Sequence, residues 1–423
     1  MEIKFKMRRL IMAIVMILPI ISADKINAQT TNQDSIVCTQ FEKDLKSYSI
    51  DINRLEKSNK KDYKALSKIY NNIITTFEKL PAELQKKYEK VTSLYYNSAC
   101  YNARSGNKKK ALECFEKVAD YGNESYSWAK VDSDLISLHK DERFKKALAR
   151  LAEKTDYSGM LKASKAYTAD KKEYQFNYAN PNDPNLVRLR TTFNLDSIAG
   201  SGNEISKIKN IMYWVHDIVR HDGSSYNPDQ KNAIDMITLC QKEKRGVNCR
   251  MMAQILNECY LAMGFKARFV TCLPKVMIDD CHVINVVYSC TLHKWIWMDP
   301  TFAAYVTDDK GTLLSIQEVR ERLRSDLPLV LNEDANWNHK SKQSKEYYLD
   351  NYMTKNLYHL ECINNTGFNT ETYIKGTTDI PEYESNHYYV DLCPPGYQPD
   401  NKTRNSIVTT DDQHFWESPY KNQ

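Results

Sequence analysis

One cysteine, one histidine and one aspartate follow one another in the most regular part of the sequence. Cys249 begins a stretch in which apolar residues recur at helical spacing, His282 opens the alternating segment HVINVVYS, and Asp299 closes the segment WIWMD. A thiol in the first turn of a helix lies at the positive end of the helix field, which favours the nucleophilic thiolate. A histidine can act as its base and an aspartate can orient that histidine, so these residues predict cysteine acyl-transfer chemistry.

The three side chains need one helix and two neighbouring strands to bring them together. The apolar spacing after Cys249 predicts a helix that ends at Gly264, since a glycine suits the left-handed position after a helix. The segment KARFVTCL then predicts a strand, and a hairpin through residues 291–294 joins the strands that carry His282 and Asp299. Paired antiparallel strands can place the histidine and the aspartate side by side at one sheet edge, with the cysteine helix packed on that sheet.

Three blocks of this region together resemble the pattern of the transglutaminase-like superfamily, which shares the papain-like core. They are Gly246 and Cys249 followed by Ala253, Gly264 and Arg268, then His282 at a strand start, then WIWMDPT from Trp295 to Thr301. The resemblance covers residues 190–310 and implies an α+β, papain-like fold with a triad of Cys249, His282 and Asp299. The chain departs from the family after the histidine, where VIN stands in place of the usual aromatic and acidic residues.

Other residues near the triad have weaker functional interpretations. The backbone N–H of Cys249 is the default oxyanion donor, and the Trp214 indole is a second candidate, although a tryptophan on an amphipathic helix is more often core. Arg250 could hold an acidic substrate group, but a surface salt bridge is the more common role. His216 and His221 do not share a helical face, and the chain has no C-x-x-C motif. We therefore expect no metal and no organic cofactor.

The composition is that of an ordinary soluble protein, with 42% hydrophobic and 27% charged residues. A net charge of +5 is spread thinly, with no basic block beyond residues 108–110, so nucleic acid is not an expected partner. Basic residues followed by a short apolar run and small residues predict a signal peptide over 1–28, hence an exported protein, periplasmic or secreted. The alternative is an uncleaved anchor; we expect no stable membrane span in the mature chain.

Eleven cysteines in an exported chain leave two possibilities open. Some could pair as disulfides around a free Cys249, or most could be small buried apolar side chains.

The length of 423 residues favours several domains. We expect a signal peptide over 1–28, a helical module over 36–154, a linker over 155–187, a catalytic core over 188–330 and a β-rich extension over 331–423. Within the core and extension we expect a strand at 188–194, helices at 205–219, 233–242 and 316–324, and strands at 388–392 and 406–410.

Residues 95–121 look like one tetratricopeptide-type repeat. Ala99, Ala111 and Phe115 fall at its small, small and large positions, and Gly106 lies at the turn between its two helices. A single repeat is weak support for an array, because such folds bury a continuous core only by stacking several units. The module is either a docking site for a protein partner or a helical extension that packs on the core.

The sequence thus predicts an exported enzyme that hydrolyses amide or peptide bonds in a peptide, a protein or a cell-wall amide. Two alternatives remain: a non-catalytic scaffold that binds a peptide or glycan, and a protein-crosslinking transglutaminase.

Overall fold

The computed structural model describes residues 32–58, 60–86, 88, 91–276, 281–371, 388–399 and 405–420. The chain divides into two compact units, Met1–Asp156 and Tyr157–Gln423. The predicted signal peptide, residues 1–28, lies outside the described residues. Within the described ranges, no helix combines the length and the apolar character needed to cross a membrane.

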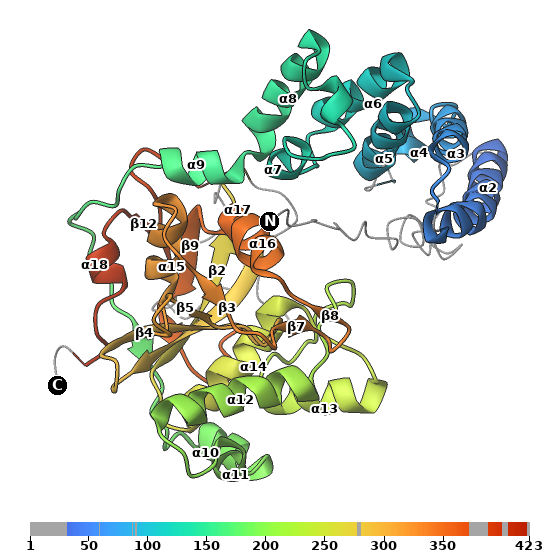
Figure 1. The fold of residues 1–423 in the computed structure, drawn as a ribbon. Helices are drawn as coiled ribbons and strands as arrows, with labels where there is room; N and C mark the ends of the chain where they lie inside the picture. The colour runs from blue at the N-terminus through green and yellow to red at the C-terminus, as the bar shows by residue number, and fades with distance from the viewer. Residues whose placement is uncertain are drawn as a thin grey trace. The chain divides into compact units, whose positions relative to one another are not determined.

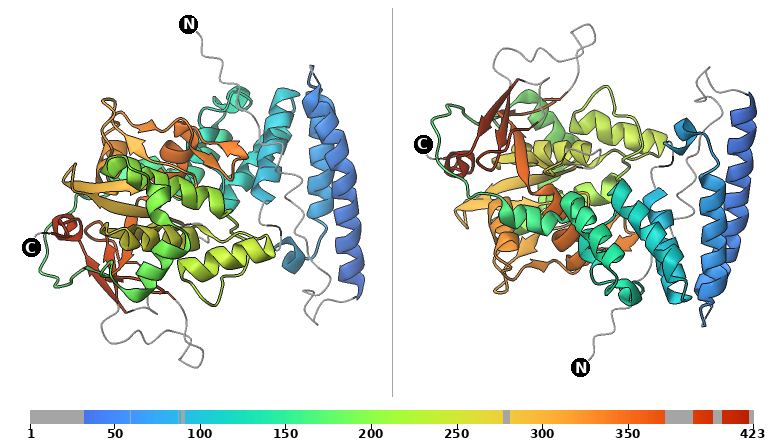
Figure 2. Two further views of the ribbon diagram at one scale, coloured as in Figure 1. Left: turned by 90° about the horizontal axis from the view of Figure 1, so that it is seen from below. Right: turned by 90° about the horizontal axis from the view of Figure 1, so that it is seen from above.

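The first unit is built from helices around one apolar core (Figures 1 and 2). Its helices are α2 (Asn32–Lys57), α3 (Tyr63–Phe77), α4 (Ala82–Gln85), α5 (Val91–Arg104), α6 (Lys108–Tyr121), α7 (Tyr126–Ala129), η2 (Ile136–Leu138) and α8 (Glu142–Thr155). Figure 2 shows α2 and α3, in blue, lying side by side along their length.

The pair α5 and α6 coincides with the segment that resembles a tetratricopeptide repeat. Ala99, Ala111 and Phe115 are fully buried in it. Gly106 has a φ of 87° in the connecting turn, a conformation that glycine adopts without strain. Asn107 then caps α6 by accepting the backbone N–H of Lys110 at 3.3 Å. The region is helical as expected, and its assignment to this type of repeat stays a prediction.

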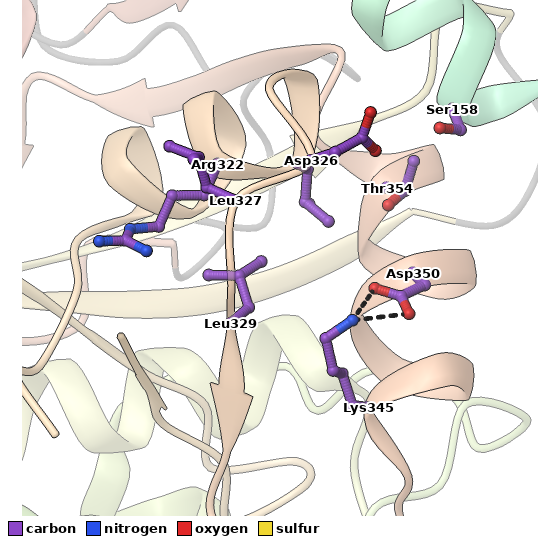
Figure 3. Close-up of a pocket in the computed structure, with 9 residues that line it drawn as sticks. Ser158, Arg322, Asp326, Leu327, Leu329, Lys345, Asp350 and Thr354 are labelled. Atoms are coloured by element: carbon purple, nitrogen blue, oxygen red, sulfur yellow. Dashed lines mark hydrogen bonds and ion pairs between the residues drawn. The ribbon is translucent and has the colours of Figure 1, made fainter. Parts of the chain in front are cut away.

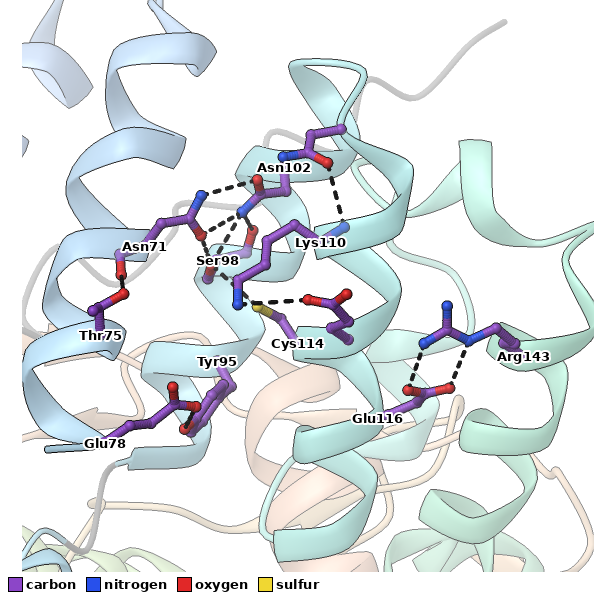
Figure 4. A network of polar contacts seen from close by, with 12 residues as sticks. Asn71, Thr75, Glu78, Tyr95, Ser98, Asn102, Lys110, Cys114, Glu116 and Arg143 are labelled. Carbon is purple, nitrogen blue, oxygen red and sulfur yellow. Dashed lines mark hydrogen bonds and ion pairs between the residues drawn. The ribbon is translucent and has the colours of Figure 1, made fainter.

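Polar side chains also tie α3 to α5 in this unit (Figure 4). Asn71 Oδ1 accepts hydrogen bonds from Ser98 Oγ at 3.0 Å and from Asn102 Nδ2 at 2.9 Å. Asn71 in turn donates from Nδ2 to Asn102 Oδ1 at 3.2 Å. The side-chain amides of Asn71 and Asn102 therefore satisfy each other between the two helices.

The second unit combines helices with a mixed sheet. Its helices are α9 (Tyr157–Ala163), α10 (Pro184–Thr192), α11 (Leu195–Ala199), α12 (Glu204–Ile218), α13 (Ala233–Glu243), α14 (Cys249–Ala262), α15 (Ile316–Arg324), α16 (Lys345–Tyr347), η3 (Tyr348–Met353), α17 (Thr354–Asn356) and α18 (Asp412–Phe415). Its strands are β1 (Asn177–Tyr178), β2 (Ala267–Leu273), β3 (His282–Ser289), β4 (Lys294–Met298), β5 (Val306–Thr307), β6 (Val330–Leu331), β7 (Asn336–Trp337), β8 (Ser341–Lys342), β9 (His359–Ile363), β10 (Asn365–Thr366), β11 (Tyr389–Leu392) and β12 (Ser406–Thr409).

Six strands form the central sheet in the order β12-β11-β9-β2-β3-β4. Strands β2, β3 and β4 form an antiparallel meander, and β9 pairs antiparallel with the other side of β2. Residues 331–423, predicted as an extension, thus supply three strands of the sheet on which the candidate site is built.

Helices cover both faces of this sheet, as Figure 1 shows. On one face α14 packs on β2 and β3, and Ala267 and Val287 join its apolar side chains in one cluster. On the other face Val270 and Val286 pack in a second cluster that includes Val319 of α15. The alternation of side chains along each strand therefore gives the sheet two buried faces, as expected for an α+β core.

The expected strand at 188–194 is wrong, because these residues belong largely to α10 (Pro184–Thr192). Asp183 caps this helix by accepting the N–H groups of Asn185 and Leu186, and Pro184 occupies its first turn. A proline at that position lacks only an N–H that would have had no partner within the helix. The Asp183-Pro184 pair, which lies in the segment predicted as a linker, is thus a helix start.

None of the eleven cysteines, all of which lie in described residues, forms a disulfide. Seven of them are buried, three are partly buried and Cys290 is exposed. Most of these side chains therefore act as small apolar core residues, the second of the two possibilities that the sequence left open.

Candidate active site

Cys249 occupies the first turn of α14, where the sequence predicted it. Asn248 caps the helix by accepting the N–H of Met251 at 3.0 Å. Gly246 lies against the preceding segment, and a Cβ there would stand 2.2 Å from the backbone oxygen of Arg220. Only a glycine therefore lets residues 220–222 approach the helix start, where His221 pairs with Val247 in a parallel bridge.

His282 and Asp299 are in direct contact. Nε2 of His282 lies 2.7 Å from Oδ2 of Asp299, and both side chains are buried. The other carboxylate oxygen accepts the backbone N–H of Thr301 at 2.8 Å. Because Nε2 faces the carboxylate, Nδ1 of His282 is the ring nitrogen left for the thiol, and His282 hydrogen-bonds Cys249. The structure thus brings all three predicted residues together, with His282 between Cys249 and Asp299.

The sulfur of Cys249 is surrounded by hydrogen-bond donors. Burial alone would raise its pKa, but bonds from His221, His282 and the backbone N–H of Val283, with the charge of His282, lower the pKa to about 6. Burial opposes the charged form of His282, yet the charge and hydrogen bond of Asp299, together with Cys249, raise the pKa of His282 to about 10. A thiolate and an imidazolium therefore coexist between about pH 6 and about pH 10.

Tyr348 completes the surroundings of Asp299, and sequence reasoning missed it. Its hydroxyl donates to Oδ2 of Asp299 at 2.5 Å, and its ring is fully buried in η3, a turn of π-helix. Asp299 thus accepts from His282, Tyr348 and the backbone of the Pro300 turn at once. The sequence interval between Tyr348 and the three candidate residues is long, and nothing in the sequence around Tyr348 pointed to this contact.

His221 is a second residue that the sequence did not assign to the site. It hydrogen-bonds Cys249, and its Nδ1 accepts the indole N–H of Trp337 at 3.1 Å. Trp214, the sequence candidate for an indole donor, instead packs at 5.5 Å between ring centroids against Phe193, beside the helical cluster around α14. Trp214 is thus a packing residue.

Arg250 is engaged inside the protein. Its guanidinium binds Glu371 through Nε at 2.8 Å and donates to Thr271 Oγ1 at 2.9 Å. Glu361 lies 3.8 Å away, and the Arg250 side chain is 20% exposed. The expected surface salt bridge is thus a largely buried one, and its partners occupy the groups that would have held an acidic substrate.

One group near the site has residue types that could hold a metal, namely His216, Asp217 and His339. Both ring nitrogens of His216 already have partners, the backbone oxygen of Pro300 at 2.9 Å and Oδ1 of Asn336 at 3.0 Å. We therefore assign no metal to this group.

A surface hollow of about 220 Å³ lies between α15 and η3 (Figure 3). Arg322, Asp326, Lys345 and Asp350 are among its lining residues, and Lys345 binds both carboxylate oxygens of the neighbouring Asp350 at 2.7 and 2.8 Å. None of the three candidate residues lines this hollow, so we assign it no role in the chemistry.

Comparisons with known proteins agree with this geometry at the level of the family. The sequence profile of the Transglutaminase-like superfamily matches residues 191–300, a range that contains all three candidate residues. Among solved structures, a protein from Cytophaga hutchinsonii, whose assignment as a cysteine protease is provisional, is 19% identical over 42% of this chain and 51% of its own, with a TM-score of 0.23. This chain therefore spans about half of that protein, and so low a TM-score carries no argument.

No curated protein matches the chain. The match of the sequence profile to residues 191–300, on the helix and strands described above, identifies this region as a member of the transglutaminase-like superfamily.

Proposed function

We propose that this protein is a cysteine acyl-transfer enzyme that hydrolyses amide or peptide bonds. The observation that carries the proposal is the hydrogen-bonded series Cys249, His282 and Asp299, with a thiol pKa of about 6 at the start of a helix. Burial without nearby donors raises the pKa of a thiol, as at Cys259 and Cys272 in the same unit.

The proposed reaction begins with attack of the Cys249 thiolate on the substrate carbonyl carbon. A C–S bond forms, and the π electrons of the carbonyl move to oxygen. When the tetrahedral intermediate collapses, the C–N bond breaks and the amine leaves with the proton of His282. His282 then takes a proton from water, whose oxygen attacks the thioester, and Cys249 departs as thiolate. Asp299 holds the imidazole through Nε2 during both steps.

A crosslinking transferase would differ only in the second step, where an amine replaces water. We favour water because it is abundant and enters without a binding site. A peptide, a protein or a cell-wall amide is the proposed substrate class. We also propose that the chain is exported, on the basis of its first 28 residues, and that the helical unit contributes a protein contact.

Two assays test the proposal and separate it from its alternatives. The first mixes the protein with p-nitrophenyl acetate at pH 7 and measures the burst of p-nitrophenolate and the acetyl group on Cys249 by peptide mass mapping. The second offers a peptide mixture with or without a fluorescent primary amine. Cleavage in both conditions supports hydrolysis, and amine incorporation into peptides supports the transferase. Cys249→Ser is the matched control. A wild type that acylates no faster than this variant would exclude the proposed enzyme and leave the non-catalytic scaffold as the remaining alternative.

A further inference from the structure

We infer that His221 supplies the side-chain donor of the oxyanion hole, and that Trp337 is the positioning residue that holds His221 in the required tautomer. This inference rests on the proposed acyl-transfer function and names a residue that the triad does not include. It starts from the two imidazoles that lie beside the sulfur of Cys249, those of His221 and His282, of which only His282 is committed to Asp299.

The backbone of His221 is fixed beside the helix that carries Cys249. Its N–H donates to Oδ1 of Asn338 at 2.7 Å, and its carbonyl oxygen accepts from Nδ2 of the same residue at 2.9 Å. The bridge to Val247 and the close approach at Gly246 add a second attachment from the other side. A residue clamped at both its N–H and its C=O is built for a defined position rather than for a mobile loop.

The tautomer of His221 follows from its partner. An indole N–H only donates, so Nδ1 of His221, at 3.1 Å from Trp337 Nε1, must be the nitrogen that accepts. The single N–H of the neutral ring is then on Nε2, and this N–H is the one available to Cys249. Trp337 thus fixes the tautomer of His221, as a carboxylate fixes that of a triad histidine. Because an indole N–H cannot accept a proton, His221 presents an N–H donor to the reacting atoms and does not serve as a base.

The chemistry gives that N–H a purpose at each stage. In the free enzyme it bonds the thiolate. When the C–S bond forms, the negative charge moves from sulfur to the former carbonyl oxygen. A donor beside the sulfur can then hydrogen-bond that oxygen. The backbone N–H of Cys249 supplies the second donor, because the first residues of a helix have no intrahelical partner for their N–H groups. No proton leaves His221, since His282 protonates the leaving group.

The test compares acylation with alkylation at the same sulfur. Acylation by p-nitrophenyl acetate passes through an oxyanion, whereas alkylation by chloroacetamide is a displacement at a saturated carbon and does not. In His221→Ala we expect the acylation rate constant to fall about 100- to 1,000-fold, as on loss of one oxyanion donor. Above pH ~9 the Cys249 thiol is ionised in both the wild type and His221→Ala. The alkylation rate constant of the variant should there stay within about threefold of the wild type.

Two further variants separate a catalytic from a structural role. His221→Gln keeps an N–H donor at a similar reach and should recover at least tenfold of the lost acylation. Trp337→Phe keeps an aromatic ring but frees the tautomer, so it should lower kcat for the ester with little change in KM. Thermal melting of each variant shows whether it is folded. If His221→Ala does not fold, the effect of Trp337→Phe on acylation decides the question.

Each outcome has one meaning. Selective loss of acylation with rescue by glutamine supports the inference. Equal acylation in wild type and His221→Ala, or equal loss of acylation and alkylation at high pH, overturns the inference and leaves the proposed function standing. A wild type that alkylates at Cys249 but never acylates overturns the proposed function, and the oxyanion role falls with it.

Discussion

Replacing His282 with alanine should raise the pH midpoint of Cys249 alkylation from about 6 toward the ordinary thiol pKa of 9.0. The thiol pKa of about 6 reflects hydrogen bonds from His221, His282 and the backbone of Val283, and the charge of His282, against the opposing effect of burial. Without the imidazolium the bonds from His221 and Val283 remain, but the bond and charge of His282 are lost while the burial persists, so the pKa rises.

The ratio of the labelling rates of wild type and His282→Ala depends on pH. For a pKa that rises fully to 9.0, the thiolate fraction at pH 5 falls from about one in ten to about one in ten thousand, but a thiolate of higher pKa is the better nucleophile. With a Brønsted coefficient of about 0.45 the gain is about 20-fold over three pKa units. The upper limit of the effect is therefore a variant that reacts about 40-fold more slowly than wild type at pH 5, about fivefold more slowly at pH 7, and faster above about pH 8.

The assay is chloroacetamide labelling from pH 4.5 to 10.5, followed by peptide mass mapping. Cys290, which is exposed, serves as an internal reference in every sample. His293→Asn is the matched control, because it removes an exposed imidazole from the same hairpin and asparagine tolerates the φ of 53° found there. Identical midpoints for wild type and His282→Ala would refute the thiolate–imidazolium pair.

Three other perturbations test the frame around the site. Gly246→Ala places a Cβ 2.2 Å from the backbone oxygen of Arg220, so it should cost about 1–3 kcal/mol, lower the melting temperature and slow acylation. Tyr348→Phe removes a buried donor to Asp299 and should cost about 1–2 kcal/mol in denaturant unfolding, while acylation falls less than tenfold. Burial raises the pKa of Glu258 to about 8, so the native state binds a proton there that the unfolded chain releases above about pH 4.5. The unfolding free energy should thus fall as pH rises from about 4.5 to about 8, with a flatter slope in Glu258→Gln; an unchanged slope by tryptophan fluorescence would contradict the assignment.

Cys249, His282 and Asp299 could be placed on their elements from the sequence because each lies at the boundary of an element with a clear period. Cys249 begins an amphipathic helix, and His282 begins the alternating strand β3. Asp299 directly follows β4. These are local signals, and the strand pairing that unites the last two needs only a short hairpin.

The supporting residues could not be found in the same way. His221, Trp337 and Tyr348 reach the site through long-range contacts, and nothing in their own neighbourhoods marks those contacts. The strand expected at 188–194 failed for a different reason. The Asp183 cap and Pro184 are a recognisable helix start, but they fall at the end of the segment predicted as a linker, residues 155–187.

The position of β9 within the sheet has a consequence for biosynthesis. Thr271 of β2 pairs with Glu361, about ninety residues further along the chain, and β11 and β12 follow only after that. A nascent chain that has emerged to residue 330 contains Cys249, His282 and Asp299 but carries β2 as an open edge. The sheet beneath Cys249 is therefore completed only after β9, β11 and β12 have been synthesised, well after the three candidate residues themselves.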